Sequence, residues 1–279
     1  MTKSPASDAM RDAASYQNHT HKDLPALPDV ALSCDGILHQ QYHLYQPKKG
    51  YRFGTDAILL SAVLAADTKG MIADFGAGAG AVAIATAHAV KSVHITAFEK
   101  DDVMAKCLSH NIALNALADR ISASENDITN LENRWDGYFD HIIANPPFHA
   151  PTGTRSRQTR RALAHHGDDD ARLADWVDAA LKALKPKGRL HFILRADRTD
   201  EMMALLRSKQ AGGIVLQPVW PYKSSPAIRV IVSAQKDVKA PFTLLAGLVL
   251  HHPDGGLTAP AAQILQGEGA GLLALPSLY

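Results

Sequence analysis

Residues 71–80, MIADFGAGAG, join a short apolar segment to a loop in which every second residue is glycine. An apolar run of this length that ends in glycines predicts a buried β-strand followed by a tight turn. Residues 81–89, AVAIATAHA, predict a helix directly after the turn. Strand, glycine loop and helix in this order are typical of the first βα unit of a nucleotide-binding α/β sheet.

Apolar strands and helices alternate along the rest of the chain. The expected strands are 71–75, 93–98, 121–124, 140–144, 190–194, 214–219 and 228–232, and the expected helices are 55–64 with Thr55 as its cap, 81–89, 101–115, 169–184 and 197–209. This alternation predicts a doubly wound, mostly parallel, seven-stranded α/β sheet with helices on both faces. Ligands bind at the carboxyl ends of such strands, where the glycines, Glu99, Asp127 and Asn145 fall.

The composition is that of an ordinary soluble globular protein. The chain has 279 residues, 46% of them hydrophobic and 20% charged, and its net charge of +1 means that any nucleic-acid surface must be local. Cys34 and Cys107 show no metal-ligand spacing, so we expect no metal site and a reducing, cytoplasmic setting. No apolar run reaches the roughly 18 residues of a membrane helix. We expect a disordered leader over residues 1–30 and one domain over 31–279.

The glycine loop suits two classes of cofactor. Glu99 ends the second strand about 20 residues after the loop, where a carboxylate accepts hydrogen bonds from ribose hydroxyls in NAD enzymes and S-adenosyl-L-methionine enzymes alike. Gly76, Gly78 and Gly80 follow the spacing G-x-G-x-G, which differs from the dinucleotide fingerprint G-x-G-x-x-G. Asp74 could meet an ammonium group or the amides of the loop, whereas a pyrophosphate would gain nothing from it. These features favour S-adenosyl-L-methionine over NAD, and both over a turn that only packs a helix.

A second carboxylate follows the third expected strand. Asp127, within Asn126-Asp127-Ile128, could accept a hydrogen bond from the exocyclic amine of an adenine. The alternative is a helix cap, since aspartate is a preferred N-cap residue.

Asn145-Pro146-Pro147-Phe148 ends the fourth expected strand and suggests a reaction. An exocyclic or amide nitrogen is a poor nucleophile because its lone pair is delocalised. Two acceptors, the Asn145 side-chain oxygen and the rigidly held Pro146 carbonyl, can localise that lone pair toward a methyl sulfonium. Phe148 can stack on a flipped base. Neither a metal nor a strong base is required. The alternative is an ordinary Pro-Pro turn.

Four stretches together resemble one family. GYRFGTDAILLSAVL (50–64), DFGAGAG (74–80), NIALNAL (111–117) and DHIIANPPF (140–148) are similar to the bacterial tRNA1(Val) adenine-N6-methyltransferase family, whose members are class I S-adenosyl-L-methionine-dependent amino-methyltransferases with an NPPF motif. The resemblance covers about residues 31–260. It implies a Rossmann-like methyltransferase fold, the product S-adenosyl-L-homocysteine, and a tRNA substrate methylated at N6 of the adenosine beside the anticodon.

The resemblance also implies roles for individual residues. The expected cofactor-binding residues are Phe53, Gly54, Thr55, Asp56, Asp74, Gly76, Gly78, Gly80, Glu99, Lys100, Asp127 and Asn145, and the expected catalytic residues are Asn145, Pro146, Pro147 and Phe148. Phe75 and Ala77 depart from the family, which commonly has Leu and Cys there, but neither side chain is needed for the contact.

Arginines follow the NPPF motif closely. Arg155, Arg157, Arg160 and Arg161, together with Arg52, are expected to contact RNA phosphates, although a solvated loop is the alternative. No separate RNA-binding module is visible, so the domain would act alone as a monomer or as a homodimer.

Other activities remain open at this point. Asn-Pro-Pro-aromatic also occurs in methyltransferases of protein glutamine N5 and of DNA or rRNA adenine. Glutamine enzymes usually carry a helical substrate domain ahead of the fold, and DNA enzymes a target-recognition domain; neither is visible. A dinucleotide-dependent oxidoreductase, or a binding protein with an inactive site, is a third possibility. Neither would need hydrogen-bond acceptors that position an amine.

Overall fold

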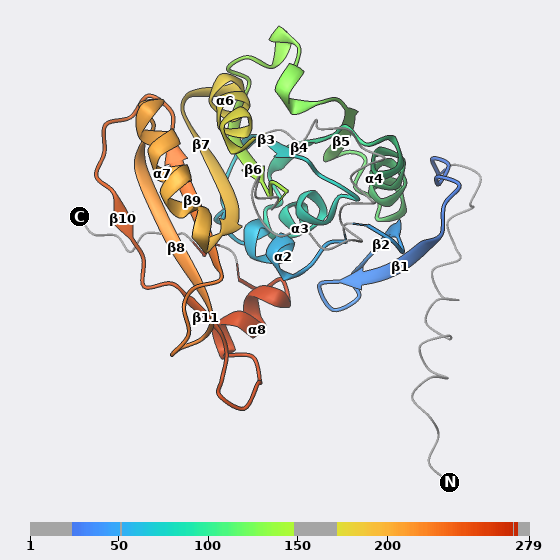
Figure 1. Cartoon of the computed structure of the whole chain (residues 1–279). Helices are drawn as coiled ribbons and strands as arrows, with labels where there is room; N and C mark the ends of the chain where they lie inside the picture. Colours follow the sequence, from blue (N-terminus) through green and yellow to red (C-terminus); the bar gives the residue numbers. More distant parts are fainter. Residues whose placement is uncertain (1–23, 51, 148–171, 270, 273–279) are drawn as a thin grey trace, which may run out of the picture.

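One large sheet, built around the strand before the glycine loop, organises the chain (Figure 1). The computed structural model describes residues 24–50, 52–147, 172–269 and 271–272. Its strands are β1 (Leu32–Ile37), β2 (Tyr42–Pro47), β3 (Gly70–Phe75), β4 (Val93–Glu99), β5 (Ile121–Glu125), β6 (Phe139–Ala144), β7 (Leu184–Arg195), β8 (Gly212–Tyr222), β9 (Arg229–Gln235), β10 (Thr243–Leu244) and β11 (Leu248–His251). Its α-helices are α2 (Thr55–Ser61), α3 (Ala81–Ala89), α4 (Asp102–Leu114), α6 (Leu173–Ala183), α7 (Thr199–Ser208) and α8 (Ala259–Leu265). Three short 3-10 helices are η2 (Ile128–Asn130), η3 (Asn133–Trp135) and η4 (Ala196–Arg198).

The order of the strands confirms the predicted fold class. The sheet runs β10-β8-β9-β7-β6-β3-β4-β5, and β11 also pairs with β8. All its pairs are parallel except those that β9 makes with β7 and β8. The sheet therefore contains the seven expected strands, and β10 and β11 make it nine-stranded. These two are only two and four residues long, too short for a strand pattern to be visible in the sequence.

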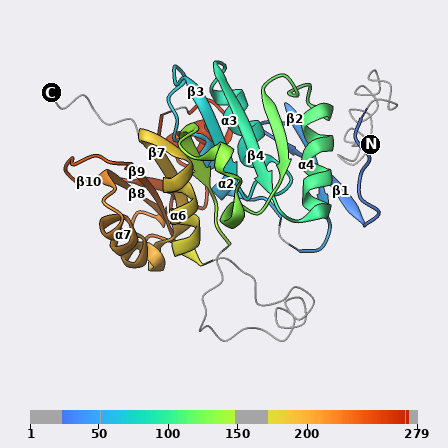
Figure 2. The same cartoon turned by 90° about the horizontal axis from the view of Figure 1, so that it is seen from above.

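Helices cover both faces of this sheet. Alternate residues of the central strands point to opposite sides, as the pleat requires. Ile72 and Ile143 belong to a core cluster with α2, α3, α4 and α8, whereas Ala73 and Ile142 belong to a second cluster with α6 and α7. Figure 2 shows α6 and α7 side by side, away from α4. Both faces are buried, which explains why the strands read as nearly continuous apolar runs.

Three local expectations were wrong. The cap of α2 is Gly54, which is extended, and Thr55 is the first helical residue. The helix also ends at Ser61 rather than at residue 64. The strand expected from residue 190 begins earlier, because β7 starts at Leu184 and includes Pro186-Lys187-Gly188. Lys187 has a φ of 64° and the pairing with β6 shifts register, so β7 tolerates the proline-glycine stretch through an irregular first half. The start of the expected helix at residue 169, like residues 1–23 of the expected leader, lies outside the described residues.

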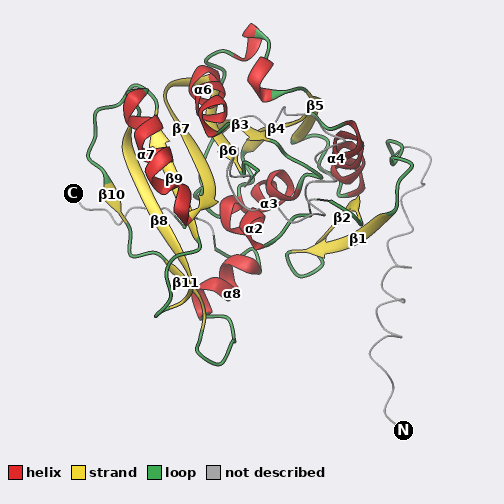
Figure 3. Cartoon of the chain, in the orientation of Figure 1, coloured by secondary structure: helices red, strands yellow, loops and turns green. Residues whose placement is uncertain are grey.

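A hairpin that the sequence did not predict stands outside the large sheet. β1 and β2 pair antiparallel with each other and lie beside α4 (Figure 3). Most of their residues are only partly buried, so no clean alternation marks them.

A pair of stacked histidines, one buried and one partly buried, predicts acid sensitivity. His141 on β6 stacks on His191 on β7, with 3.2 Å between Nδ1 and Nε2. Burial lowers the pKa of both, that of His141 to about 4, and the charge of Arg189 lowers both further. The unfolded chain takes up protons below about pH 6.5, where the native state resists them. The free energy of unfolding should therefore fall between pH 7 and pH 4, by about 3 kcal/mol from His141 and in the same direction from His191.

Urea unfolding at several pH values tests this expectation. The variant His141→Gln with His191→Leu should show a shallower pH dependence than the wild type. His94→Gln, which changes an exposed histidine on β4, is the control and should keep the wild-type slope. Equal slopes in all three proteins would contradict the prediction.

Candidate functional site

The glycine loop turns directly off β3 at the carboxyl edge of the sheet. Gly76, Gly78 and Gly80 have φ values of 67°, 56° and 97°, in the left-handed region that glycine enters without strain. A Cβ atom on Gly76 would stand 2.5 Å from the ring of Trp176 on α6. The Ala77 N–H donates to the Phe98 carbonyl at 2.9 Å, which ties the loop to β4. The loop is thus fixed by its own backbone and by both neighbouring elements.

Glu99, at the end of β4, lies against this loop. Its Oε2 accepts from the Gly78 N–H at 2.7 Å, and its Oε1 accepts from the Asp101 N–H at 2.9 Å. The side chain is largely buried. Because a carboxylate oxygen can accept more than one hydrogen bond, both oxygens retain capacity for a ligand hydroxyl.

Asp74 is buried beneath the loop, with 1% of the residue exposed. Its Oδ2 has no hydrogen-bond partner among the described residues. Burial raises the pKa of this carboxyl to about 8; a hydrogen bond from the Ala83 backbone opposes the rise and the charge of Glu99 adds to it. A buried acid that lacks a positive partner is a frequent mark of a binding site.

Asp127 serves as a helix cap, the alternative that the sequence left open. Its Oδ1 accepts from the Thr129 N–H at 2.9 Å and from the Thr129 hydroxyl at 2.8 Å, at the start of η2. Its Oδ2 lies 3.6 Å from the Lys100 Nζ. Burial would raise the pKa of Asp127, but the Thr129 bonds and Lys100 lower it. Asp127 and Ile128 also line a cavity of about 680 Å³ between η2 and α6, so a contact with a ligand stays compatible with the cap.

The first turn of α2 and the residue before it line a second cavity. Gly54, Thr55 and Asp56 border a hollow of about 380 Å³ that also involves β8, β9 and β11. Asp56 stands in the first turn of α2 and pairs with Arg229 on β9, with 2.7 Å between Oδ2 and Nε. Arg229 could not be predicted as a partner of Asp56, because 173 residues separate the two in the sequence.

Asn145 lies beside the glycine loop. Ala144, the last residue of β6, pairs with Phe75, the last residue of β3, so Asn145 and Gly76 follow neighbouring strands at the same edge. Asn145 is half-buried, Pro146 is buried and Pro147 is exposed. Phe148 and the four arginines Arg155, Arg157, Arg160 and Arg161 lie outside the described residues. Arg52 is described, and its guanidinium pairs with Asp35 at 2.9 Å while 41% of the side chain stays exposed.

The edge of the sheet therefore presents acceptors at several depths. These groups are the buried carboxyl of Asp74, the Glu99 carboxylate with its remaining acceptor capacity, the backbone of the glycine loop, and the Asn145 amide, which two prolines follow. Within the described part of the chain, no group of three His, Cys, Asp or Glu side chains could hold a metal ion. No described helix is long and apolar enough to cross a membrane.

Known proteins share this sequence pattern and this fold. The profile of the methyltransferase small domain family matches residues 52–209. A tRNA1(Val) (adenine(37)-N6)-methyltransferase from Shewanella baltica is 27% identical over 230 residues, which cover 81% of this chain and 95% of the relative. A protein of the same name from Actinobacillus succinogenes is 28% identical over 209 residues, 74% of this chain and 85% of the relative.

Solved structures agree on the fold. A crystal structure described as a predicted O-methyltransferase, Atu636 from Agrobacterium tumefaciens, superimposes with a TM-score of 0.64 at 27% identity. The match covers 77% of this chain and 97% of that chain.

Proposed function

The chain belongs to the methyltransferase small domain family, and from this premise we propose that it transfers a methyl group from S-adenosyl-L-methionine to the exocyclic N6 of adenine in RNA. The relatives named above, which are tRNA1(Val) (adenine(37)-N6)-methyltransferases, support tRNA-Val, modified beside the anticodon, as the RNA. The observation that carries the proposal is the position of Asn145-Pro146-Pro147, next to the glycine loop at the carboxyl edge of the sheet.

The residues present fit the cofactor. Asp74 has a buried oxygen that finds no partner among the described residues, and an ammonium group would satisfy it. Glu99 has acceptor capacity for ribose hydroxyls, and the left-handed glycines let the backbone approach the ligand. Gly54, Thr55 and Asp56 border the cavity at the start of α2, where the methionine end would lie, and Phe53 directly precedes them and packs against the core. Asp127, which pairs with Lys100, lines the other cavity, where the adenine would lie.

The two hydrogen-bond acceptors at Asn145 and Pro146 match the two N–H groups of an aromatic amine. S-adenosyl-L-methionine supplies an electrophilic methyl group on a sulfonium sulfur. The Asn145 side-chain oxygen and the Pro146 carbonyl would accept the two amine hydrogens and draw the nitrogen toward tetrahedral geometry, which localises its lone pair for attack. Transfer of the methyl group to that nitrogen would break its bond to sulfur and leave S-adenosyl-L-homocysteine. One amine proton is then acidic and leaves to solvent, so positioning carries most of the catalysis.

Thermal melting tests the cofactor. S-adenosyl-L-homocysteine should raise the melting temperature, because a ligand that binds only the native state stabilises it by mass action. NAD should leave the melting temperature unchanged. The opposite pattern would favour the oxidoreductase.

The acceptor is tested with labelled S-adenosyl-L-methionine. Total tRNA, ribosomal RNA, DNA and a glutamine-containing protein are offered separately, and we expect label in tRNA. Label in another acceptor would move the substrate to the corresponding class of amino-methyltransferase. A 2′-O-methylated nucleoside would instead indicate transfer to oxygen, as the description of Atu636 as a predicted O-methyltransferase suggests for that protein.

We further propose that RNA phosphates bind to Arg52, Arg155, Arg157, Arg160 and Arg161. Replacing the last four with alanine should weaken RNA binding and reduce the slope of log affinity against log salt by about 0.7–0.9 for each lost contact. Filter binding at several salt concentrations measures this slope. The variant Arg134→Ala with Arg207→Ala, two exposed arginines elsewhere, is the control. An unchanged slope in the fourfold variant would leave residues 155–161 as a solvated loop.

The proposed setting is the cytoplasm, as a monomer or homodimer. Both cysteines are free, with Cys34 exposed and Cys107 buried, which suits a reducing compartment.

A further inference from the structure

Two asparagines, Asn111 on α4 and Asn115 at its C-cap, hold the β1–β2 hairpin. Asn111 and Asn115 lie one helical turn apart. The side-chain amide of each forms two hydrogen bonds with the backbone of one β2 residue, one as acceptor and one as donor. Asn115 Oδ1 accepts from the His43 N–H at 3.0 Å and its Nδ2 donates to the His43 carbonyl at 2.8 Å. Asn111 does the same to Tyr45, at 2.8 and 2.9 Å. Side chains thus complete the backbone hydrogen bonding of an edge strand.

Asn111 makes one contact that Asn115 lacks. Its Nδ2 also donates to the Ala79 carbonyl at 2.8 Å, and Ala79 lies inside the glycine loop. Asn111 is fully buried, so these hydrogen bonds are protected from water. One side chain therefore connects the glycine loop to β2.

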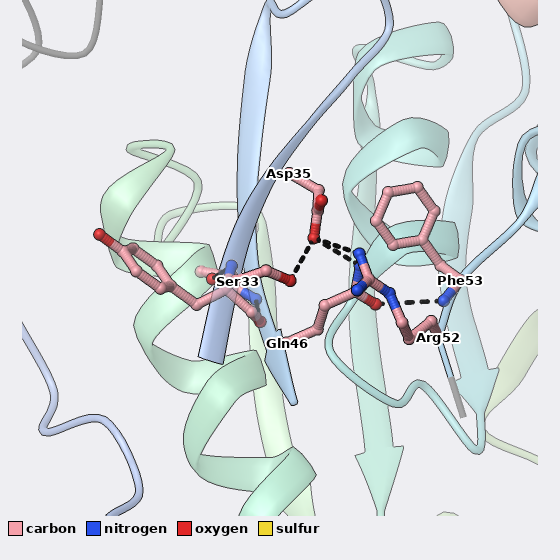
Figure 4. Close-up of polar contacts among 7 residues, drawn as sticks. Ser33, Asp35, Gln46, Arg52 and Phe53 are labelled. Carbon is pink, nitrogen blue, oxygen red and sulfur yellow. Dashed lines mark hydrogen bonds and ion pairs between the residues drawn. The ribbon is translucent and has the colours of Figure 1, made fainter. Parts of the chain in front are cut away.

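The next residue of β2 continues the connection. Gln46 is 2% exposed, and its Oε1 accepts from the Phe53 N–H at 3.2 Å while its Nε2 donates to Asp35 Oδ2 at 2.8 Å. The same Asp35 oxygen accepts from Ser33 at 2.7 Å and from Arg52 at 2.9 Å. Figure 4 shows the contacts of Ser33, Gln46 and Arg52 meeting at Asp35, and the contact from Gln46 to Phe53. The hairpin thereby holds residues 52 and 53, directly ahead of Gly54 and α2.

We propose that Asn111 and Gln46 are positioning residues of the cofactor site, which join the glycine loop, through the backbone of β2, to the segment that begins α2. The inference rests on the proposed function, since it assigns both segments to one ligand. The loop around Ala79 and the segment around Phe53 are separate in the sequence. The Asn111 side chain connects the backbone of Ala79 to that of Tyr45, and the Gln46 side chain continues to the backbone of Phe53. Holding both segments before the ligand arrives reduces the entropy lost on binding.

The matched variants are Gln46→Met and Asn115→Leu. Both replace an amide with an apolar side chain of similar size, and both loosen the hairpin. Only Gln46→Met breaks a contact to a cofactor-binding segment. Affinity for S-adenosyl-L-homocysteine is measured by calorimetry, KM for S-adenosyl-L-methionine and kcat with tRNA by steady-state kinetics, and stability by melting without ligand.

We expect Gln46→Met to raise Kd and KM together by about tenfold, as for loss of a buried hydrogen-bond partner, with little change in kcat. Asn115→Leu should lower the melting temperature and leave Kd near the wild-type value. If Gln46→Met does not fold, Asp35→Asn, an isosteric change on the partly exposed β1, should raise Kd about threefold.

Two failures are distinguishable. A wild-type protein that binds no S-adenosyl-L-homocysteine would overturn the proposed function itself. A wild type that binds and transfers methyl groups, with Gln46→Met or Asp35→Asn no weaker in Kd than Asn115→Leu, would overturn the positioning role alone.

Discussion

Asn145→Ala should abolish methyl transfer while S-adenosyl-L-homocysteine still binds. The substitution removes an oxygen that accepts an amine hydrogen only while the nitrogen attacks, so we expect kcat to fall at least about a hundredfold, as when one oxyanion-hole donor is lost. Asn145 directly follows β6 and lies at the same edge of the sheet as Gly76. The substitution leaves the glycine loop, Glu99 and Asp74 unchanged. Affinity for the cofactor product should therefore stay close to that of the wild type.

Two further variants sharpen this expectation. Asn145→Asp keeps an acceptor oxygen and should retain more activity than Asn145→Ala. Asn133→Ala changes an exposed asparagine on η3 and should behave as the wild type. Loss of S-adenosyl-L-homocysteine binding in Asn145→Ala would mean that Asn145 mainly supports the cofactor.

Asp74→Asn should make the unliganded protein more stable at pH 8 and weaken its binding of the cofactor. The pKa of Asp74 is raised to about 8 by burial first, whereas in the unfolded chain it stays near 3.8. Between these values the native state holds a proton that the unfolded state has released, so the wild type loses stability as pH rises from about 4 to 8. The asparagine does not titrate. The difference should reach up to about 5 kcal/mol at pH 8 and shrink toward pH 5.

Urea unfolding at pH 5 and pH 8 measures the effect on stability, and calorimetry with S-adenosyl-L-homocysteine measures the effect on binding. In the wild type, an ammonium group beside Asp74 favours the charged carboxylate, so binding at pH 7 should release a proton. Buffers with different ionisation enthalpies reveal that release. Equal stability of Asp74→Asn and the wild type at both pH values would contradict the assigned pKa.

The sheet was predictable because its strands carry strong local signals. β3, β4 and β6 are buried on both faces. Gly76 follows β3, Glu99 is the last residue of β4 and Asn145 follows β6, so the apolar runs and their ends are visible in the sequence. The parallel order then brings those ends to one edge, which is why Glu99 and Asn145 could be expected near the glycine loop. Their roles toward a ligand stay predictions.

Other features depend on contacts that no local pattern carries. The β1–β2 hairpin is stabilised by Asn111 and Asn115 rather than by its own alternation, and Arg229 meets Asp56 only after the sheet has formed. The interior of β7 contains a proline and a glycine, which locally predict a break. Pairing with β6 and β9 overrides that preference.

The most direct test is methyl transfer from labelled S-adenosyl-L-methionine to total tRNA, followed by digestion and mass spectrometry of the nucleosides, with Asn145→Ala in parallel. The account predicts labelled N6-methyladenosine with the wild-type protein and none with Asn145→Ala. Label in a different nucleoside, or equal N6-methyladenosine from both proteins, would contradict it.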